Sequence, residues 1–191
     1  LVINPVTTNN AGNYDVIVSN SGGSATSVVA TLTVIVPVIA PTITTPPASL
    51  TVTQGQSASF SVAASGTAPL SYQWRFKSAN LVGQTSSGLV INPATTNDAG
   101  NYDVIISNSG GSATSAVATL TVLVPPNITT SPVSQTATQG YGATFTVLAS
   151  GTAPLSYQWR FKNANLVGQT GLTLVINPVT TNNAGNYDVI V

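Results

Sequence analysis

The sequence contains no glutamate, histidine, cysteine or methionine, and its only charges are four aspartates, two arginines and two lysines. Its formal net charge is therefore zero. Nucleic acids and anionic membranes are bound through clustered Lys and Arg, so we expect neither as a partner. Without cysteine no disulfide can form, which suits a reducing compartment but also secreted bacterial repeats that fold without oxidation. Cysteine content alone leaves the compartment open.

The sequence also lacks a long apolar run. The longest stretch, around Val34 to Ala40, is interrupted by Pro37 and is far shorter than the roughly 18 to 20 residues that a membrane helix needs. We therefore expect no membrane span in this segment. The N-terminus has no basic segment, no apolar signal region and no Met, so we expect any export signal to lie outside this window.

Residues suited to catalysis or metal binding are missing as well. Acid–base and nucleophilic catalysis need paired titratable groups, and zinc and calcium sites need His, Cys or clustered acidic side chains. The four aspartates are scattered, and Asp98 aligns with Asn10 and Asn183, which indicates a turn-stabilising role. We expect no enzymatic activity, no cofactor and no metal site.

An internal repeat dominates what is present. Residues 66–77 return letter for letter at residues 151–162, so Trp74 and Trp159 are 85 positions apart. The segment Asn-Tyr-Asp-Val-Ile occurs three times, with tyrosines at positions 14, 102 and 187, which gives offsets of 88 and 85. We assign the three extra residues to Val38, Ile39 and Ala40 in the first linker.

Within each repeat, apolar residues alternate with polar ones, the pattern of strands with one buried face. Gly and Pro separate these strands, and Asn108-Ser109-Gly110-Gly111 is typical of a tight hairpin. No helix is indicated. Several short strands without a crossover helix predict an all-β antiparallel sandwich. The apolar positions of the complete repeat are Phe60, Val62, Tyr72, Trp74, Phe76, Leu89, Ile91, Tyr102, Val104, Leu120 and Val122.

The order of Trp74, Leu89-x-Ile91, Asp98-x-Gly100-x-Tyr102-x-Val104 and Leu120-x-Val122 resembles an immunoglobulin-like domain. It is most similar to the I-set-like domains found in tandem in large bacterial extracellular and surface repeat proteins. The resemblance implies tandem Greek-key sandwiches. It also implies three domains: residues 1–36 with strands E to G, a complete domain at 37–124, and residues 125–191 with strands A to F.

The same resemblance assigns structural roles to single residues. The two family cysteine positions correspond to Val62 and Val104, and in the next repeat to Val147 and Val189, so the chain is a cysteine-free variant. Tyr102 would form the tyrosine corner, with its hydroxyl bonded to backbone between Asn97 and Gly100. The expected core signature is completed by Tyr14, Val16, Trp74, Trp159 and Tyr187.

Alternation places Asp103 on the outer face, beside Arg75 and Lys77 on a neighbouring strand. We expect cross-strand ion pairs there and among their counterparts, Arg160, Lys162 and Asp188. Nearly all aromatic residues have an inward position, and only Tyr141 is expected to be free. On the outer face, Val90 and Ile105 lie among Ser, Thr and Asn with scarcely any charge, which leaves open either an ordinary Thr-rich surface or lateral association.

Near-identical repeats without a specialised loop favour a structural role. We expect a stalk, fibre or filament outside the cell or on its surface, whose main partner is itself through adjacent repeats or subunits. The alternative is an adhesin that binds a surface glycan or protein, and a more remote one is an accessory module of a secreted hydrolase.

Residues 1–18 repeat the letters of residues 174–191, a period of 173 that equals 88 plus 85. We therefore expect the sequence to be a window on a longer polymer. Strands A to D of one unit would meet strands E to G of the next, either along one polypeptide or by strand exchange between subunits.

Overall fold

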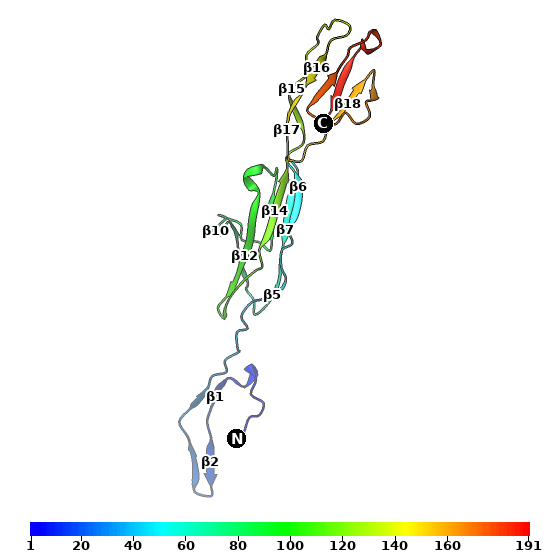
Figure 1. Ribbon diagram of the computed structural model, residues 1–191. Helices are drawn as coiled ribbons and strands as arrows, with labels where there is room; N and C mark the ends of the chain where they lie inside the picture. The colour runs from blue at the N-terminus through cyan, green and yellow to red at the C-terminus, as the bar shows by residue number, and fades with distance from the viewer.

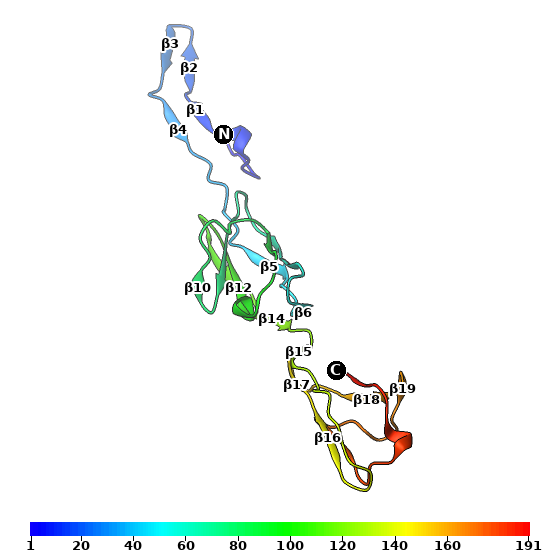
Figure 2. The same ribbon diagram turned by 90° about the horizontal axis from the view of Figure 1, so that it is seen from above.

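A computed structural model describes all of residues 1–191 and contains only β-strands and three short 3-10 turns. Three units follow one another end to end, with the two termini in the outer units (Figures 1 and 2). We call residues 1–36 the N-terminal unit, 37–124 the central unit and 125–191 the C-terminal unit. The expected all-β fold class is confirmed.

The central unit has two layers of strands. In the first layer, β5 (Thr42–Thr45) pairs with β8 (Ala63–Ser65), and β7 (Ala58–Ser61) pairs with β11 (Gly88–Ile91). The second layer is larger, and several neighbours in it, such as β9 with β12 and β14 with β6, are not consecutive in sequence, as in a Greek key. Its order is β10 (Ala79–Asn80), β9 (Ser71–Phe76), β12 (Gly100–Asn108), β14 (Ala118–Leu123) and β6 (Leu50–Thr53), with β13 (Gly111–Thr114) also paired to β12.

One pairing in this layer is parallel. Strand β6 lies beside β14 in the same direction, with Leu50 opposite Leu120, whereas the other pairs are antiparallel. Strand β14 therefore lies between two partners, β12 on one edge and β6 on the other.

The core of the central unit follows the alternation of the sequence. Strand β14 alternates strictly between buried and exposed residues, and β12 buries every second side chain from Tyr102 to Ile106. The rings of Phe60 and Trp74 lie 6.1 Å apart and those of Phe60 and Tyr102 5.0 Å apart, within the usual range for packed aromatic pairs. Twelve buried residues form the core: Ala58, Phe60, Val62, Trp74, Leu89, Ala94, Tyr102, Val104, Ile106, Ala118, Leu120 and Val122.

The C-terminal unit has a smaller core of Val147, Trp159 and Leu174. Residues 135–138, which correspond to β6, form no strand here, because no counterpart of β14 pairs with them. Its paired strands are β15 (Asn127–Thr130) with β17 (Leu148–Ser150), β16 (Ala143–Thr146) with β20 (Thr173–Ile176), and β18 (Gln158–Phe161) with both β19 (Ala164–Asn165) and β21 (Tyr187–Ile190).

The N-terminal unit is a single layer without a buried residue. It consists of β1 (Gly12–Tyr14) paired with β4 (Ala30–Leu32), and β2 (Ile17–Asn20) paired with β3 (Gly23–Thr26). Residues 1–3, which correspond to residues 89–91 of β11, form no strand, because no strand of the chain lies beside them. Leu1 and Val2 are accordingly 99% and 90% exposed.

Candidate functional site

The predicted core residues lie at equivalent places in the central and C-terminal units. Trp74 and Trp159 are fully buried, and their indole nitrogens donate to the carbonyl oxygens of Ser86 at 2.9 Å and Gly171 at 3.0 Å. A buried indole N–H needs such an acceptor, since leaving it unpaired costs free energy. The four valines at the family cysteine positions differ: Val62, Val104 and Val147 are buried, and Val189 is half-buried.

The N-terminal counterparts do not form a core. Val16 is 57% exposed although Val104, its counterpart in the central unit, is fully buried, and Tyr14 is only half-buried. Val16 therefore lies outside the core in this structure, because the N-terminal unit has no second layer to cover its apolar face.

The tyrosine hydroxyls are bonded in the same way in all three units. Tyr102 Oη donates to the carbonyl oxygen of Asp98 at 2.7 Å, Tyr187 to that of Asn183 at 2.8 Å, and Tyr14 to that of Asn10 at 2.6 Å. Burial, together with the nearby charge of Asp98, raises the pKa of Tyr102 to about 12. Burial also raises the pKa of Tyr187. These tyrosines join strand to turn and are not reactive groups.

The turn that precedes each tyrosine explains why the position of Asp98 is occupied by asparagine in the other two repeats. Asp98 Oδ2 accepts hydrogen bonds from the backbone N–H and the hydroxyl of Thr95, at 2.8 and 2.7 Å. Asn10 and Asn183 use Oδ1 in the same way towards Thr7 and Thr180. Only a side-chain oxygen is needed, so the charge of Asp98 is dispensable for this turn.

Arginine, and not lysine, pairs with the outer aspartates. Arg75 Nε and Nη2 donate to Asp103 Oδ1 and Oδ2, both at 2.7 Å, in a two-pronged arrangement. Arg160 and Asp188 repeat the arrangement, and the hydrogen bond from Arg160 lowers the pKa of Asp188. The hydrogen bond to Asp103 likewise raises the pKa of Arg75.

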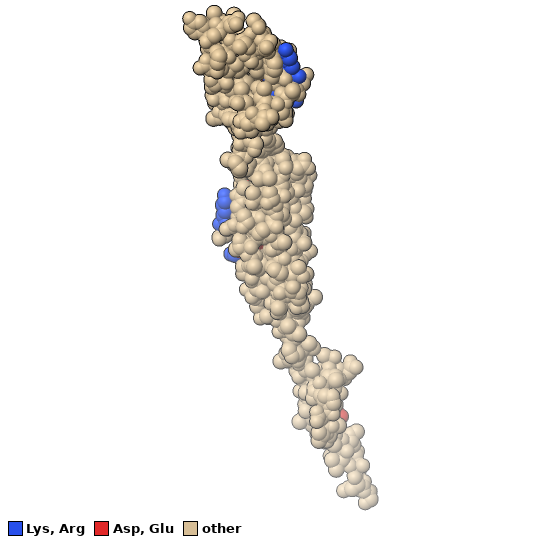
Figure 3. All heavy atoms as spheres, turned by 45° about the vertical axis from the view of Figure 1, so that its right-hand side comes forward, with Lys and Arg blue, Asp and Glu red and all other residues tan.

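Neither lysine forms the ion pair with an aspartate that we expected. Lys77 Nζ lies 4.6 Å from the ring centre of Phe76, and Lys162 Nζ lies 4.7 Å from that of Phe161. These are cation–π contacts on the surface of the molecule. The few basic side chains lie on two of the three units (Figure 3).

At the first junction, hydrogen bonds fix the beginning of the central unit to the rest of that unit. The backbone N–H of Ile39 donates to Thr67 Oγ1 at 2.8 Å, and the N–H of Thr67 donates back to the carbonyl oxygen of Ile39 at 3.0 Å. Asn108 Nδ2 donates to both Ile39 O and Thr67 O, each at 2.8 Å. A Cβ added to Gly110 would lie 3.0 Å from Val38 Cγ1, so the hairpin approaches the linker closely.

The second junction repeats the same pair of bonds. The N–H of Val124 donates to Thr152 Oγ1 at 2.7 Å, and the N–H of Thr152 donates to Val124 O at 2.9 Å. On the other side, the N–H of Gln54 donates to Leu123 O at 2.7 Å. Val124, which directly follows β14, is thus bonded to the C-terminal unit, and Leu123 at the end of β14 is bonded to the central unit.

This equivalence corrects the position of the linker insertion. Ile39 and Val124 make the same bonds to Thr67 and Thr152, so they are corresponding residues. The three extra residues therefore lie between Val34 and Ile39, and not at Val38, Ile39 and Ala40 as expected. Sequence reasoning missed the junction threonines, although both lie in the repeated Gly-Thr-Ala-Pro segment.

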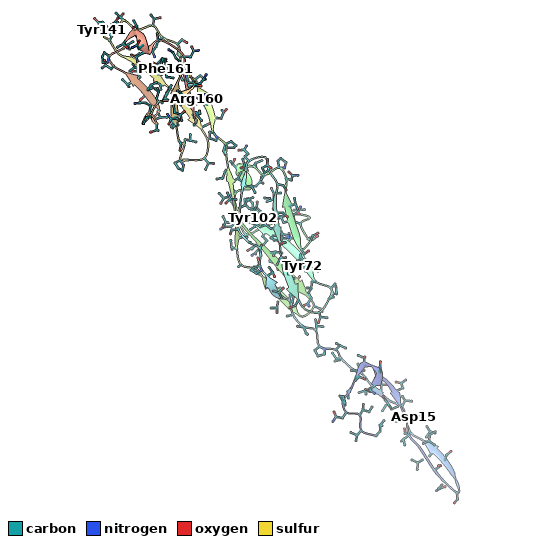
Figure 4. The ribbon with its side chains drawn as sticks, turned by 90° about the vertical axis from the view of Figure 1, so that its right-hand side faces the viewer. Asp15, Tyr72, Tyr102, Tyr141, Arg160 and Phe161 are labelled. Carbon is teal, nitrogen blue, oxygen red and sulfur yellow. The ribbon has the colours of Figure 1, made fainter.

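Other features of a ligand site are few. No helix in the structure has the length and apolar character required to cross a membrane. Tyr141, 71% exposed, lies at the far tip of the C-terminal unit, whereas Tyr72 and Tyr102 lie within the central unit (Figure 4). A single exposed ring provides no extended platform for a carbohydrate.

Comparison with known proteins agrees with the fold. The family model for the immunoglobulin domain matches residues 40–108 and 125–191. Roundabout homolog 1 of Mus musculus and that of Homo sapiens are each 32% identical to the chain over 165 residues, which cover 84% of this chain and 10% of theirs. The chain therefore spans about a tenth of the length of these relatives.

Two solved structures of tandem domains have the same architecture. The I-band fragment I67–I69 of titin superposes with a TM-score of 0.71 at 20% identity, over 96% of this chain and 70% of that one. Immunoglobulin domains 1–4 of Sidekick-1 give a TM-score of 0.65 at 23% identity, over 96% and 55%. At these identities the likeness concerns the fold alone.

Proposed function

Because the chain belongs to the immunoglobulin-domain family and hydrogen bonds join its central unit to its C-terminal unit, we propose that it is a structural spacer. In this role it forms a segment of a stalk or fibre that holds other parts of a protein at a distance. The role requires no enzymatic chemistry.

The bonded junctions are the observation that supports this proposal. A flexible tether would have a linker whose backbone groups face water, as in Gly- and Ser-rich linkers. Here Val124 exchanges two hydrogen bonds with Thr152 of the following unit, and Ile39 exchanges the same two with Thr67 of its own unit. The bonds of Val124 favour a stiff connection between the central and C-terminal units.

The location proposed for this spacer is outside the cell or on its surface. The near-identity of the repeats and the lack of cysteine support the proposal that the chain is part of a bacterial surface protein, since such repeats fold without oxidation. The surface is rich in Thr, Ser and Asn and carries almost no charge, so it has little electrostatic attraction for charged polymers. This agrees with a spacer role.

Small-angle X-ray scattering tests the stiffness of the junctions. Thr67→Val and Thr152→Val together keep the side-chain shape but remove both hydroxyl acceptors. We expect the parent chain to scatter as a rod and the double variant to show a shorter mean length and a broader distance distribution. Thr121→Val, an exposed position on β14, is the matched control and leaves the curve unchanged. A double variant that scatters like the parent would contradict the role of the junctions.

Binding assays separate the spacer from an adhesin. We expect the 191-residue chain to bind no component of a glycan array and to retain no extracellular protein in pull-downs. Saturable micromolar binding would replace the spacer role with recognition, and mapping would then begin at Tyr141, the one ring that stands free.

A further inference from the structure

Strand β11 of the central unit has one edge without a partner. It pairs with β7 alone, where Val90 lies opposite Ser59. Residues 81–87, which lead into β11, form no strand beside it. They are held against the other layer instead, since the N–H of Trp74 in β9 donates to Gln84 O at 3.0 Å. The open edge belongs to the central unit itself, whose strands all lie within residues 37–124.

This edge presents backbone groups that have no partner in the structure. In an antiparallel pair, residues whose N–H and C=O point to the neighbouring strand alternate with residues whose groups point away from it. The N–H of Val62 donates to Ser87 O, which fixes the phase of this alternation. Gly88 and Val90 are therefore turned away from β7. Outside the ladder with β7, no hydrogen bond reaches the backbone of either residue.

Strand β11 also lacks the features that prevent an edge strand from pairing. It contains no charge, no proline and no bulge, and Val90 is 61% exposed on its outer face. The other edge of the same layer, β5, has a register shift between Ile43 and Thr45 and is bordered by proline on both sides. In the second layer, β10 has only two residues and lies close to Lys77, and β6 presents only threonine outward.

The C-terminal unit has the same open edge. Strand β20 pairs with β16 alone, and Val175, the counterpart of Val90, is 57% exposed. The position that β14 fills in the central unit lies in the other layer, so it does not bear on this edge. The two units follow one another along the rod, so β11 and β20 of one molecule cannot pair with each other (Figure 1).

We propose that β11 of one molecule pairs with β11 of a second copy, so that rods of this chain associate side by side and run in opposite directions. A second copy is favoured because the strand is complementary to itself. With Val90 of the two copies opposite each other, the outward N–H and C=O groups meet in pairs, and Gly88 of each copy faces Asn92 of the other. No charge lies on the strand, so identical edges do not repel each other.

A single pairing of this length buries little surface and is weak by itself. Each molecule has two such edges, on β11 and on β20, so one rod contacts more than one neighbour and several weak pairings act together. Side-by-side association goes beyond the proposed spacer role. The spacer depends on the junction bonds within one chain, whereas association depends only on the open edges, so either can fail without the other.

A single cysteine tests the register of this pairing. The parent chain has no cysteine. Residues directly opposite each other in an antiparallel pair have Cα atoms about 4.5 to 5.5 Å apart, which permits a disulfide. Under mild oxidation, Val90→Cys should therefore form a covalent dimer. Ser59→Cys is the matched control on the same face, one strand further in. Its two copies would lie about 14 Å apart, so it should form only the slow product of random collisions.

Sedimentation tests association without a covalent bond. The mass of the parent chain should rise with concentration, and Val90→Lys combined with Val175→Lys should abolish the rise, because like charges would then face each other across each pairing. Ser59→Lys combined with Thr144→Lys adds the same charge to the same face one strand away from the edge and should preserve the rise. Tryptophan fluorescence shows that all variants are folded.

Four results would each overturn the proposal. They are a parent chain that stays monomeric, an edge variant that associates like the parent, a control variant that loses association like the edge variant, and Ser59→Cys dimers that form as fast as Val90→Cys dimers.

Discussion

Valine to alanine substitutions at equivalent positions of the repeat should have very different effects. Val104 of the central unit is fully buried, whereas Val16 of the N-terminal unit is 57% exposed, although both follow the same Asn-Tyr-Asp segment. The two changes remove the same atoms from the same local sequence. Any difference in their effect must therefore come from what covers the side chain.

The magnitude follows from burial. Val104→Ala removes two buried methyl groups, worth about 0.8 kcal/mol each by transfer, and the cavity that remains adds to this. We expect a loss of about 2 to 3 kcal/mol in the free energy of unfolding of the central unit. Val16→Ala should leave the stability of the central unit unchanged, since Val16 contributes nothing to its core.

Urea unfolding followed by tryptophan fluorescence measures the effect. Trp74 and Trp159 are the only tryptophans, so a Trp159→Phe background reports on the central unit alone. With a urea slope of about 1 to 1.5 kcal/mol per molar, Val104→Ala should lower the midpoint by about 2 M. A shift under about 0.5 M, or an equal shift for Val16→Ala, would refute the reasoning from burial.

Three further predictions concern the central unit and use the same unfolding assay. Tyr102→Phe removes the hydrogen bond to Asp98 O and should cost about 1 to 2 kcal/mol, and a cost near zero would show that water replaces the hydroxyl. Because the pKa of Tyr102 is raised to about 12 from an ordinary value near 10, its contribution is complete below pH ~10 and is lost as the pH rises towards 12. The midpoint should therefore fall more steeply over that range in the parent than in Tyr102→Phe, and parallel curves would contradict the assignment. Gly100→Ala should cost at least about 1 kcal/mol more than Gly55→Ala. Both glycines have positive φ, but only at Gly100 would the new Cβ lie 2.9 Å from Phe76 Cε2, so equal effects would count against the clash.

The sequence predicted the fold well because the alternation and the repeat are both local signals. Trp74, Tyr102, Val104, Leu120 and Val122 lie in the core that their spacing indicated. Burial itself depends on a neighbouring strand, which a local pattern does not reveal. Residues 1–18 and 174–191 have identical letters, yet Leu1 is 99% exposed and Leu174 is 2% exposed. Leu174 belongs to a strand paired with β16, whereas Leu1 has no such partner.

The junctions were beyond sequence reasoning for a related reason. Thr67 and Thr152 have no unusual chemistry, and their hydroxyls matter only because the fold brings the linker backbone to them. The choice of arginine over lysine as the partner of Asp103 is also geometric. The guanidinium can bond both carboxylate oxygens at once, while the lysine chain reaches the ring of its neighbour Phe76.

The parallel pairing of β6 with β14 has a mechanical consequence for a chain of such units. Tension applied at the two ends of the central unit first loads β5, which is paired with β8, and β14; once β5 is released, it pulls β6 back by its first residue and β14 forward by its last. Because the two strands run in the same direction, this load slides them past each other and strains the hydrogen bonds of the ladder together. An antiparallel hairpin pulled apart from one end would lose its bonds one at a time. The central unit should therefore resist stretching along the axis far better than peeling from the side.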